Sequence, residues 1–223
     1  MNPPSKDSAA PEPSSENLAF VGQVTASVTH ELSNVLGTIE QVVGIVEDMT
    51  DLDESLAPET RERLRSVVER IAKQSDRGAG LIRRLNRFAH LNDVAFGECN
   101  VGELVGNVVA LAERAAGLRK VELTSTGLDQ SVVLTTSPLQ LAQVVYGSIL
   151  RALSVADRSA PLEVAMEPRD HGCTLVFEAA RKPDGEPEDS VLDPLSLAAQ
   201  LGWNVDEQNG GERYRLTLTT GEK

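Results

Sequence analysis

The chain has 223 residues, 40% of them hydrophobic and 25% charged, which is enough for one large or two small globular domains. Its formal net charge of −13 argues against nucleic acid as the main partner, because phosphate binding needs clustered positive charge. The two cysteines, Cys99 and Cys173, have no metal-ligand spacing and fit free thiols in a reducing compartment. No apolar run reaches the roughly 18 residues of a membrane span and no signal-peptide pattern is present, so we expect a cytoplasmic protein without membrane contact.

The first third of the chain has the pattern of one long helix. Residues 1–16 are rich in Pro, Ser and Ala without periodicity, and we predict a disordered tail there. From residue 17 to 49, apolar residues recur in steps of three and four: Val21, Val24, Val28, Leu32, Val35, Ile39, Val42, Val46 and Met49. This heptad seam predicts a helix with a single apolar stripe, which needs partner helices to be buried.

A second helix follows after a short acidic connection at 51–57. Pro58 suits its first turn. A weaker seam then runs to about His90: Leu64, Val67, Ile71, Gln74, Gly78, Leu81, Leu85 and Phe88. Two long helices joined by a short loop make an antiparallel hairpin, and one hairpin is half of a bundle. We therefore predict that residues 17–92 form a homodimer through a four-helix bundle.

Residues 93–223 alternate between helix and strand patterns, which predicts a mixed α/β domain with helices packed on one sheet. Helices are expected at 101–116, 138–156 and 191–201, and strands at 120–126, 131–135, 162–166 and 174–179. Asn209-Gly210 lies between two further strand-like runs and predicts a β-hairpin turn.

His30 is the residue whose surroundings suggest chemistry. It lies about 160–200° around the helix from the seam residues Val28 and Leu32, so its side chain should face solvent. Asn34 is one turn later on the same face, and Glu31 is adjacent. A neutral imidazole could act as a nucleophile for phosphoryl groups, with the carboxylate taking its proton and the amide holding a water. Taken alone, the same residues also fit an ordinary solvated helix face.

Two segments resemble the sensor histidine kinase family. HELSNVLG, residues 30–37, is similar to its phosphoacceptor box, His-Glu-x-x-Asn followed by Pro-Leu, with Val35 in place of the proline. LIRRLNRFA, residues 81–89, resembles the end of the second hairpin helix, and the resemblance runs from residue 17 to the C-terminus. It implies that His30 is the phosphoacceptor, Glu31 the assisting base and Asn34 the residue that positions water for phosphatase chemistry. It also implies an α/β sandwich of the histidine-kinase ATPase type over residues 93–223.

The residues with which this family binds ATP are not evident. Residues 138–145 resemble the start of the family's asparagine-bearing helix, but Gly147 and Arg151 stand where its two asparagines are expected. The second asparagine would ligate Mg²⁺, whereas arginine offers no ligand oxygen and brings a positive charge.

The glycine-rich parts of the nucleotide site are also missing. Residues 178–185 lack the Asp-x-Gly-x-Gly box, the expected lid is shortened to 186–193, and the helix that follows begins without glycines. Backbone amides therefore cannot close around phosphates. We expect this chain to bind no cofactor or metal of its own, so that any Mg²⁺ is supplied by the receiver partner.

The second helix is strongly basic. From residue 58 to 90, eight Arg and one Lys face four acidic residues, a net charge of +5, so the rest of the chain carries −18. Receiver domains of response regulators present acidic residues around their phosphoacceptor Asp, so we expect Arg83, Arg84 and Arg87 to bind that partner. The alternative is a solubilising face with internal ion pairs.

Three functional hypotheses result. The first is a histidine phosphotransferase that relays phosphoryl groups between His30 and receiver Asp residues, with an upstream histidine kinase as a further partner. The second is a divergent cytoplasmic sensor histidine kinase with a nucleotide site that its motifs do not reveal. The third is a non-catalytic pseudokinase scaffold. Nucleotide binding separates the first two, and phosphorylation of His30 separates both from the third.

Overall fold

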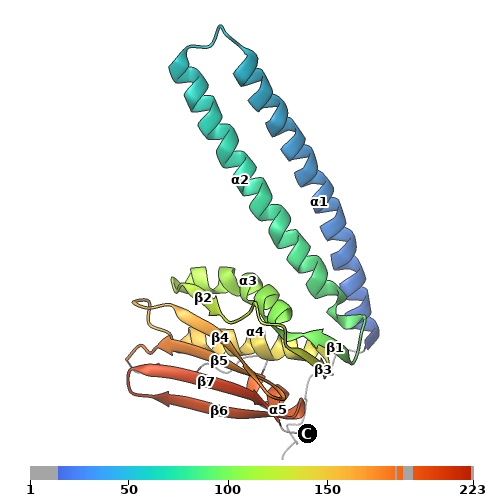
Figure 1. The fold of residues 1–223 in the computed structure, drawn as a ribbon, viewed down its shortest axis with the longest axis vertical. Helices are drawn as coiled ribbons and strands as arrows, with labels where there is room; N and C mark the ends of the chain where they lie inside the picture. The colour runs from blue at the N-terminus through green and yellow to red at the C-terminus, as the bar shows by residue number, and fades with distance from the viewer. Residues whose placement is uncertain (1–14, 184, 188–192, 222–223) are drawn as a thin grey trace, which may run out of the picture.

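The structure, a computed structural model, describes residues 15–183, 185–187 and 193–221. It consists of a long helical hairpin followed by a mixed α/β part (Figure 1). The predicted tail over residues 1–16 lies outside the described residues up to residue 14, and Ser15 and Glu16 already belong to the first helix. Within the described residues, no helix has both the length and the apolar character that crossing a membrane requires.

The hairpin is made of α1, Ser15–Leu52, and α2, Pro58–Ala89, which ends in a short 3₁₀ turn, His90–Asn92. Pro58 occupies the first turn of α2, as predicted. The two helices meet along a narrow strip, and the residues buried there are small: Thr29, Val43 and Thr50 on α1, with Val68 and Ser75 on α2. The contact between the helices of one chain is therefore thin and partly polar.

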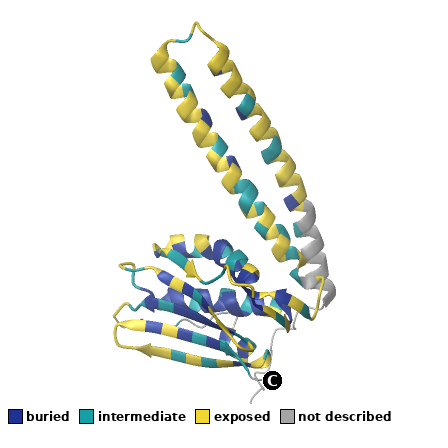
Figure 2. Cartoon of the chain, in the orientation of Figure 1, coloured by how far each residue is buried: buried dark blue, intermediate teal, exposed yellow. Residues whose placement is uncertain are grey.

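The predicted apolar seams do not face each other within this hairpin. Their side chains are 37–65% exposed: Val28, Leu32, Val35, Ile39, Val42, Val46 and Met49 on α1, and Val67, Ile71, Leu81, Leu85 and Phe88 on α2. The side chains of Val21 and Val24 lie outside the described part. Most of the hairpin surface is exposed, in contrast to the α/β part (Figure 2). A long apolar seam on each helix is therefore exposed in the single chain.

Both seams border the same open groove of about 350 Å³. Its lining contains no charged side chain: Thr38, Ile39, Val42, Val43, Val46, Leu64, Val67, Val68 and Ile71. Because the lining comes from both helices, the two seams lie on one side of the hairpin. A molecule bound on that side would contact apolar side chains of both helices.

The α/β part contains a five-stranded sheet in the order β2-β4-β5-β7-β6, in which β2 and β4 run parallel and the other neighbours antiparallel. Its strands are β2 Leu123–Thr126, β4 Leu162–Arg169, β5 Gly172–Ala180, β6 Trp203–Gly210 and β7 Arg213–Thr220. Its helices are α3 Val101–Arg119, α4 Pro138–Val155 and α5 Pro194–Gln200. The predicted mixture of a helical segment and an α/β sheet part is confirmed.

The core of the α/β part lies between α4 and the sheet, with α3 and α5 packed against α4. Leu141 and Ile149 of α4 and Phe177 and Leu216 of the sheet are fully buried. Strand β4 alternates between buried and exposed residues over its first half, so the other face of the sheet is open.

Two strands differ from the prediction of a single sheet. Strand β1, Gly97–Asn100, pairs with β3, Val133–Thr136, in a separate two-stranded antiparallel ribbon. The prediction that the strand at 131–135 joins the main sheet was wrong, and β1 was not predicted at all. Its four residues, Gly-Glu-Cys-Asn, are too few to establish an alternating pattern.

The β-hairpin at the end of the chain is confirmed, but the position of its turn was wrong. Gly210 pairs with Arg213, so the two loop residues are Gly211 and Glu212 rather than Asn209 and Gly210. Gly211 has φ +64°, which glycine adopts without strain. A glycine at the first position of a two-residue loop is typical of a type II′ turn, which suits the twist of paired strands.

Candidate functional site

His30 lies on α1 with its side chain in solvent, as its spacing from the seam predicts. Asn34, one turn later, is also exposed, and its Nδ2 atom lies 3.5 Å from Nδ1 of His30. The other ring nitrogen, Nε2, makes no hydrogen bond to any described residue. The prediction that His30 and Asn34 share one exposed face is thus confirmed.

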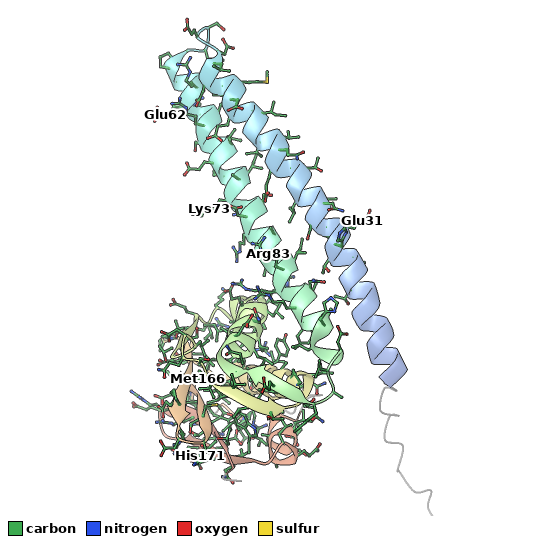
Figure 3. All side chains as sticks on the ribbon, turned by 45° about the vertical axis from the view of Figure 1, so that its right-hand side comes forward. Glu31, Glu62, Lys73, Arg83, Met166 and His171 are labelled. Carbon is green, nitrogen blue, oxygen red and sulfur yellow. The ribbon has the colours of Figure 1, made fainter. Side chains whose placement is uncertain are left out.

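Glu31 is exposed and projects from the outer side of α1, away from α2 (Figure 3). In the described part of the chain, no hydrogen bond or ion pair joins its carboxylate to His30. Its role as the assisting base therefore remains a prediction, and Asn34 is the neighbour that contacts the ring.

A partly buried polar pair joins α1 to α2 beside His30. Thr29 is only 1% exposed, and its Oγ1 donates to Oδ1 of Asn86 over 3.1 Å. Ser33 adds a hydrogen bond from its Oγ to the backbone oxygen of Thr29 at 2.9 Å. Sequence reasoning assigned no role to Thr29 or Asn86. The signal in the sequence that could have found them was a polar residue, Thr29, on the side of α1 that faces α2.

The Thr29–Asn86 bond also places the turn of α2 that carries the three predicted docking arginines beside the His30 turn. Arg83 is exposed and Arg84 is half-buried (Figure 3 labels Arg83). Arg87 instead reaches α3, with Nη1 3.4 Å from Oε1 of Glu103 and 3.5 Å from Oδ1 of Asn107. Arg83 and Arg84 are therefore free for a partner in the way the prediction requires, whereas Arg87 joins the hairpin to the α/β part.

Arg151 stands on α4, where the family pattern has a magnesium-binding asparagine, and it is held by an ion pair. Its Nε and Nη2 atoms donate to the two carboxylate oxygens of Glu207 on β6, at 2.6 and 3.0 Å. The hydroxyl of Tyr214 on β7 donates to the same carboxylate at 2.7 Å. The side chains of Arg151 and Glu207 are only 18% and 19% exposed, so this network links α4 to two strands in a largely dry environment.

The ionisation of the three groups reflects this network. Burial by itself would raise the pKa of Glu207, but hydrogen bonds from Arg151 and Tyr214 outweigh it and hold the pKa below its ordinary value. The hydrogen bond to Glu207 raises the pKa of Arg151, and burial followed by that same carboxylate raises the pKa of Tyr214. The pair is therefore fully charged at neutral pH and the tyrosine is a neutral donor.

Two more cations near the end of β5 are engaged by the same domain. Lys182 donates from Nζ to the backbone oxygen of Ser154 at 2.6 Å. Arg181 donates to the backbone oxygen of Gly185 at 2.7 Å and to Oδ1 of Asn209 at 2.8 Å. The predicted short lid at 186–193 lies outside the described residues over 188–192.

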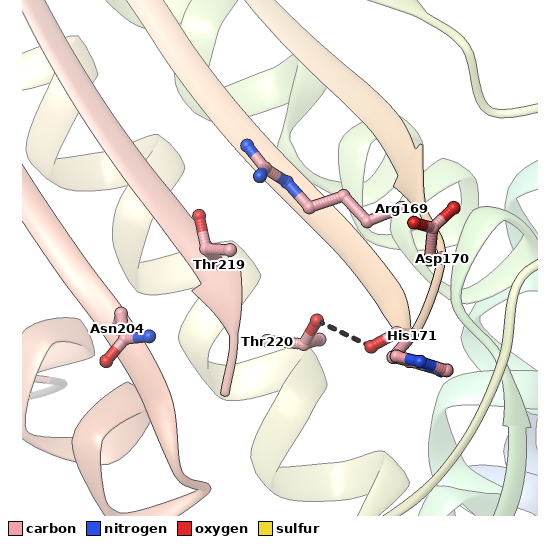
Figure 4. A pocket seen from close by; sticks show the side chains of 6 residues that line it. All are labelled: Arg169, Asp170, His171, Asn204, Thr219 and Thr220. Carbon is pink, nitrogen blue, oxygen red and sulfur yellow. Dashed lines mark hydrogen bonds between the residues drawn. The ribbon is translucent and has the colours of Figure 1, made fainter. Parts of the chain in front are cut away.

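A separate pocket of about 520 Å³ opens at the turn between β4 and β5, lined by Arg169, Asp170, His171, Asn204, Thr219 and Thr220. Its side chains do not converge, because Arg169 and His171 point apart (Figure 4). His171 lies at the end of the α/β part farthest from the hairpin (Figure 3). This pocket is thus remote from His30, and we assign it no part in the site.

No metal centre competes with this interpretation. Across residues 15–183, 185–187 and 193–221, no group of three or more His, Cys, Asp or Glu side chains is arranged to hold a metal ion. Cys99 and Cys173 are both buried free thiols, as predicted. Burial raises the pKa of Cys173 to about 12, so this thiol is unreactive at neutral pH.

Comparison with known proteins gives distant relatives of one kind. No family model matches the chain. The sensor histidine kinase ZraS of Klebsiella oxytoca is 23% identical over 206 residues, which cover 88% of this chain and 43% of that protein. ZraS of Escherichia coli (strain K12) is 22% identical over 205 residues, 88% of this chain and 42% of that protein. The chain thus spans less than half the length of these curated relatives.

Solved structures with a similar arrangement include two histidine kinases. Acinetobacter baumannii AdeS is 16% identical, with 86% of this chain and 97% of that chain covered and a TM-score of 0.45. ThkA in complex with the response regulator protein TrrA is also 16% identical, with 91% of this chain and 62% of that chain covered and a TM-score of 0.47.

The Arg151–Glu207–Tyr214 network should contribute measurably to stability. Replacing Glu207 with Gln should lower the free energy of unfolding at pH 7 by roughly 1–3 kcal/mol, because Arg151 is left with an uncompensated, mostly buried charge. Since the folded-state pKa of Glu207 is lowered, its contribution is complete above the ordinary value of 4.5 and is lost as pH falls through the lowered pKa. Urea unfolding at pH 7 and below pH 4 measures both effects.

The matched control is Glu212→Gln, which removes an exposed carboxylate from the turn between β6 and β7. It should change stability by less than about 0.5 kcal/mol. Equal destabilisation by the two variants would show that the network adds nothing.

Proposed function

We propose that this chain is a phosphoryl-transfer protein of two-component signalling, in which His30 exchanges a phosphoryl group with the Asp of a response-regulator receiver domain. An exposed imidazole on a long helix, with Asn34 at Nδ1 and Nε2 open to a partner, supports this proposal. In such a transfer the hairpin has to supply only a positioned nucleophile and a matching surface, while the receiver brings the Mg²⁺.

The finer proposal is a histidine phosphotransferase without a nucleotide site of its own. The observation that carries it is the Arg151–Glu207 pair, because the described residues do not fit a magnesium-bound nucleotide at that position. A guanidinium offers no oxygen to a metal, and this one is already bound to a carboxylate over two hydrogen bonds. Lys182 and Arg181, which a triphosphate could attract, are engaged by backbone and amide oxygens.

A divergent sensor histidine kinase is the second candidate. The similarity to the sensor kinase ZraS over 88% of the chain favours it over the phosphotransferase, whose specific features no comparison addresses. The scaffold hypothesis gains no specific support. Whether the chain binds nucleotide decides between the first two candidates.

We expect no ATP or ADP binding by calorimetry in the presence of Mg²⁺. The physical reason is the positive charge at Arg151 together with the missing glycine boxes. An authentic histidine kinase ATPase domain, titrated under the same conditions, serves as the positive control. A dissociation constant in the micromolar range would establish the kinase candidate in place of the phosphotransferase.

A second copy of the chain is the occupant we propose for the open side of the hairpin. Both seams lie on that side, their lining is uncharged, and a two-fold axis along the hairpin would set each seam against its counterpart. The result is a four-helix bundle in which the open seams become the core.

Replacing Leu32 or Val35 with Asp should therefore dissociate the dimer. An unpaired charge in the bundle core costs several kcal/mol, enough to shift a micromolar sample to monomer. Light scattering measures the mass directly. Gln41→Asp adds the same charge to an exposed position off the seam and should leave the dimer intact. A wild-type chain that is monomeric at micromolar concentration would refute the bundle.

Charge is divided between the two helices in a way that suits an acidic partner. Helix α1 contains no Lys or Arg, whereas α2 carries nine basic residues, among them Arg83 and Arg84 on the turn before Asn86. A receiver with an acidic rim would be repelled by α1 and attracted by α2. Such a partner has to approach His30 from the α2 side.

Charge reversal of Arg83 or Arg84 to Glu should weaken receiver binding by about three- to tenfold at low salt, and by less at high salt. Arg70→Glu is the matched control, because it lies on the same helix about 21 Å nearer the hairpin tip. Surface plasmon resonance at two salt concentrations distinguishes them. Equal losses in all three variants would indicate a general effect of charge rather than a docking site.

The chemistry is tested at His30 itself. Incubation with phosphorylated receiver domains should place an acid-labile label on the wild-type chain and none on His30→Ala. The dimer should persist in this variant because the side chain is exposed. Glu31→Ala should slow transfer by about 10- to 100-fold if the carboxylate takes a proton, the lower part of the usual range for general acid–base help. Wild-type relay by His30→Ala would overturn the proposed function.

A further inference from the structure

The ring of His30 has a single polar contact within the described chain, and it is made by Asn34 rather than Glu31. Nδ2 of Asn34 lies 3.5 Å from Nδ1 of the ring. Asn34 is held on a regular helical turn, where Thr38 donates from Oγ1 to its backbone oxygen at 3.0 Å. The two residues are four apart, so the helix itself keeps the carboxamide beside Nδ1.

A neutral imidazole carries a proton on one nitrogen and a lone pair on the other. Nε2 is the nitrogen open to a partner, so it can attack phosphorus only when the proton resides on Nδ1. Whatever sits beside Nδ1 therefore controls how much of the ring is in the reactive form. In this chain that neighbour is Asn34.

We propose that Asn34 is a positioning residue that sets the tautomer of His30. A carboxamide rotated by half a turn exchanges its oxygen and nitrogen at nearly the same positions. With Oδ1 turned toward the ring, Asn34 accepts the hydrogen bond from Nδ1–H and leaves the lone pair on Nε2. This assignment is additional to the water-positioning role that the family resemblance implies for Asn34. Its use in phosphoryl transfer rests on the proposed function, but its test does not.

The step that this arrangement serves is phosphoryl transfer from the receiver's carboxylate to Nε2 of His30. The Nε2 lone pair forms the N–P bond while the bond between phosphorus and the receiver's carboxyl oxygen breaks, and the carboxylate leaves with the electron pair. The ring is then cationic and still carries its proton on Nδ1, hydrogen-bonded to Asn34. Loss of that proton to a base, either the Glu31 carboxylate of the proposed function or solvent water, gives the neutral phosphorylated ring. Asn34 exchanges no proton at any point, which is why it positions the ring without being a catalytic acid or base.

The direct test is the tautomer ratio of His30, measured by ¹⁵N and ¹³C NMR of the full chain labelled in histidine, at a pH where the ring is neutral. His90 and His171 provide internal references in the same spectra. Asn34→Ala removes the contact, Asn34→Asp offers only acceptor oxygens, and Ser33→Ala is the matched control. Ser33 bonds the backbone oxygen of Thr29 and does not touch the ring.

We expect the Nδ1–H form to be about two- to fivefold more populated in the wild type than in Asn34→Ala, the change that one ordinary side-chain hydrogen bond can supply. Asn34→Asp should equal or exceed the wild type, and Ser33→Ala should match it. An unchanged ratio in Asn34→Ala would overturn the proposal. A wild-type shift toward Nε2–H would overturn it as well, because the amide would then act as a donor.

A second readout uses phosphoramidate, a small donor that needs no receiver domain. The initial rate of Nε2 phosphorylation should fall in Asn34→Ala by the same factor as the Nδ1–H population and should be unchanged in Ser33→Ala. A rate that does not follow the population contradicts the assigned role. If the tautomer and the phosphoramidate rate respond as expected but no receiver exchanges phosphate with His30, the proposed function fails and the assignment of Asn34 stands.

Discussion

The structure depends on the angle between two stripes on each hairpin helix. On α1, Thr29 and Val43 meet α2 and lie about 80° and about 40° around the helix from Ile39, to one side of the apolar seam. The intrachain contact therefore cannot bury the seam, and only a surface from outside the hairpin can. His30 is about half a turn from the seam, so covering the seam leaves the imidazole in water. The exposure of the seam and the exposure of His30 thus follow from the same helical spacing.

The α/β part is held together by polar contacts between its helices and its sheet. The Arg151–Glu207 pair and the hydroxyl of Tyr214 tie α4 to β6 and β7 through charge-assisted hydrogen bonds. Arg87 in turn joins α2 to α3 through Glu103. These contacts link the helices of the α/β part to its sheet and to the lower end of α2.

Long periodic segments were predictable because many residues agree on one pattern, which is why both hairpin helices and the face shared by His30 and Asn34 could be derived from spacing. Short segments, and segments with two equally suitable turn residues, could not be assigned from the sequence. Strand β1 has only four residues, and the last turn had two adjacent glycines from which to choose. The polar pairs could not be predicted for another reason. Thr29 and Asn86 are 57 residues apart in the sequence, and Arg151 and Glu207 are 56 apart. Local patterns carry no information about such partners.

The bidentate pair on α4 also restricts how this chain can change during evolution. Exchanging Arg151 for an asparagine would leave the carboxylate of Glu207, 19% exposed, with the Tyr214 hydroxyl as its remaining partner. Exchanging Glu207 first would strand the guanidinium in the same way. Each single exchange is thus harmful while the double exchange can be tolerated, a case of epistasis between positions far apart in sequence. A change at position 151 to a side chain with a ligand oxygen is therefore coupled to the residue at position 207.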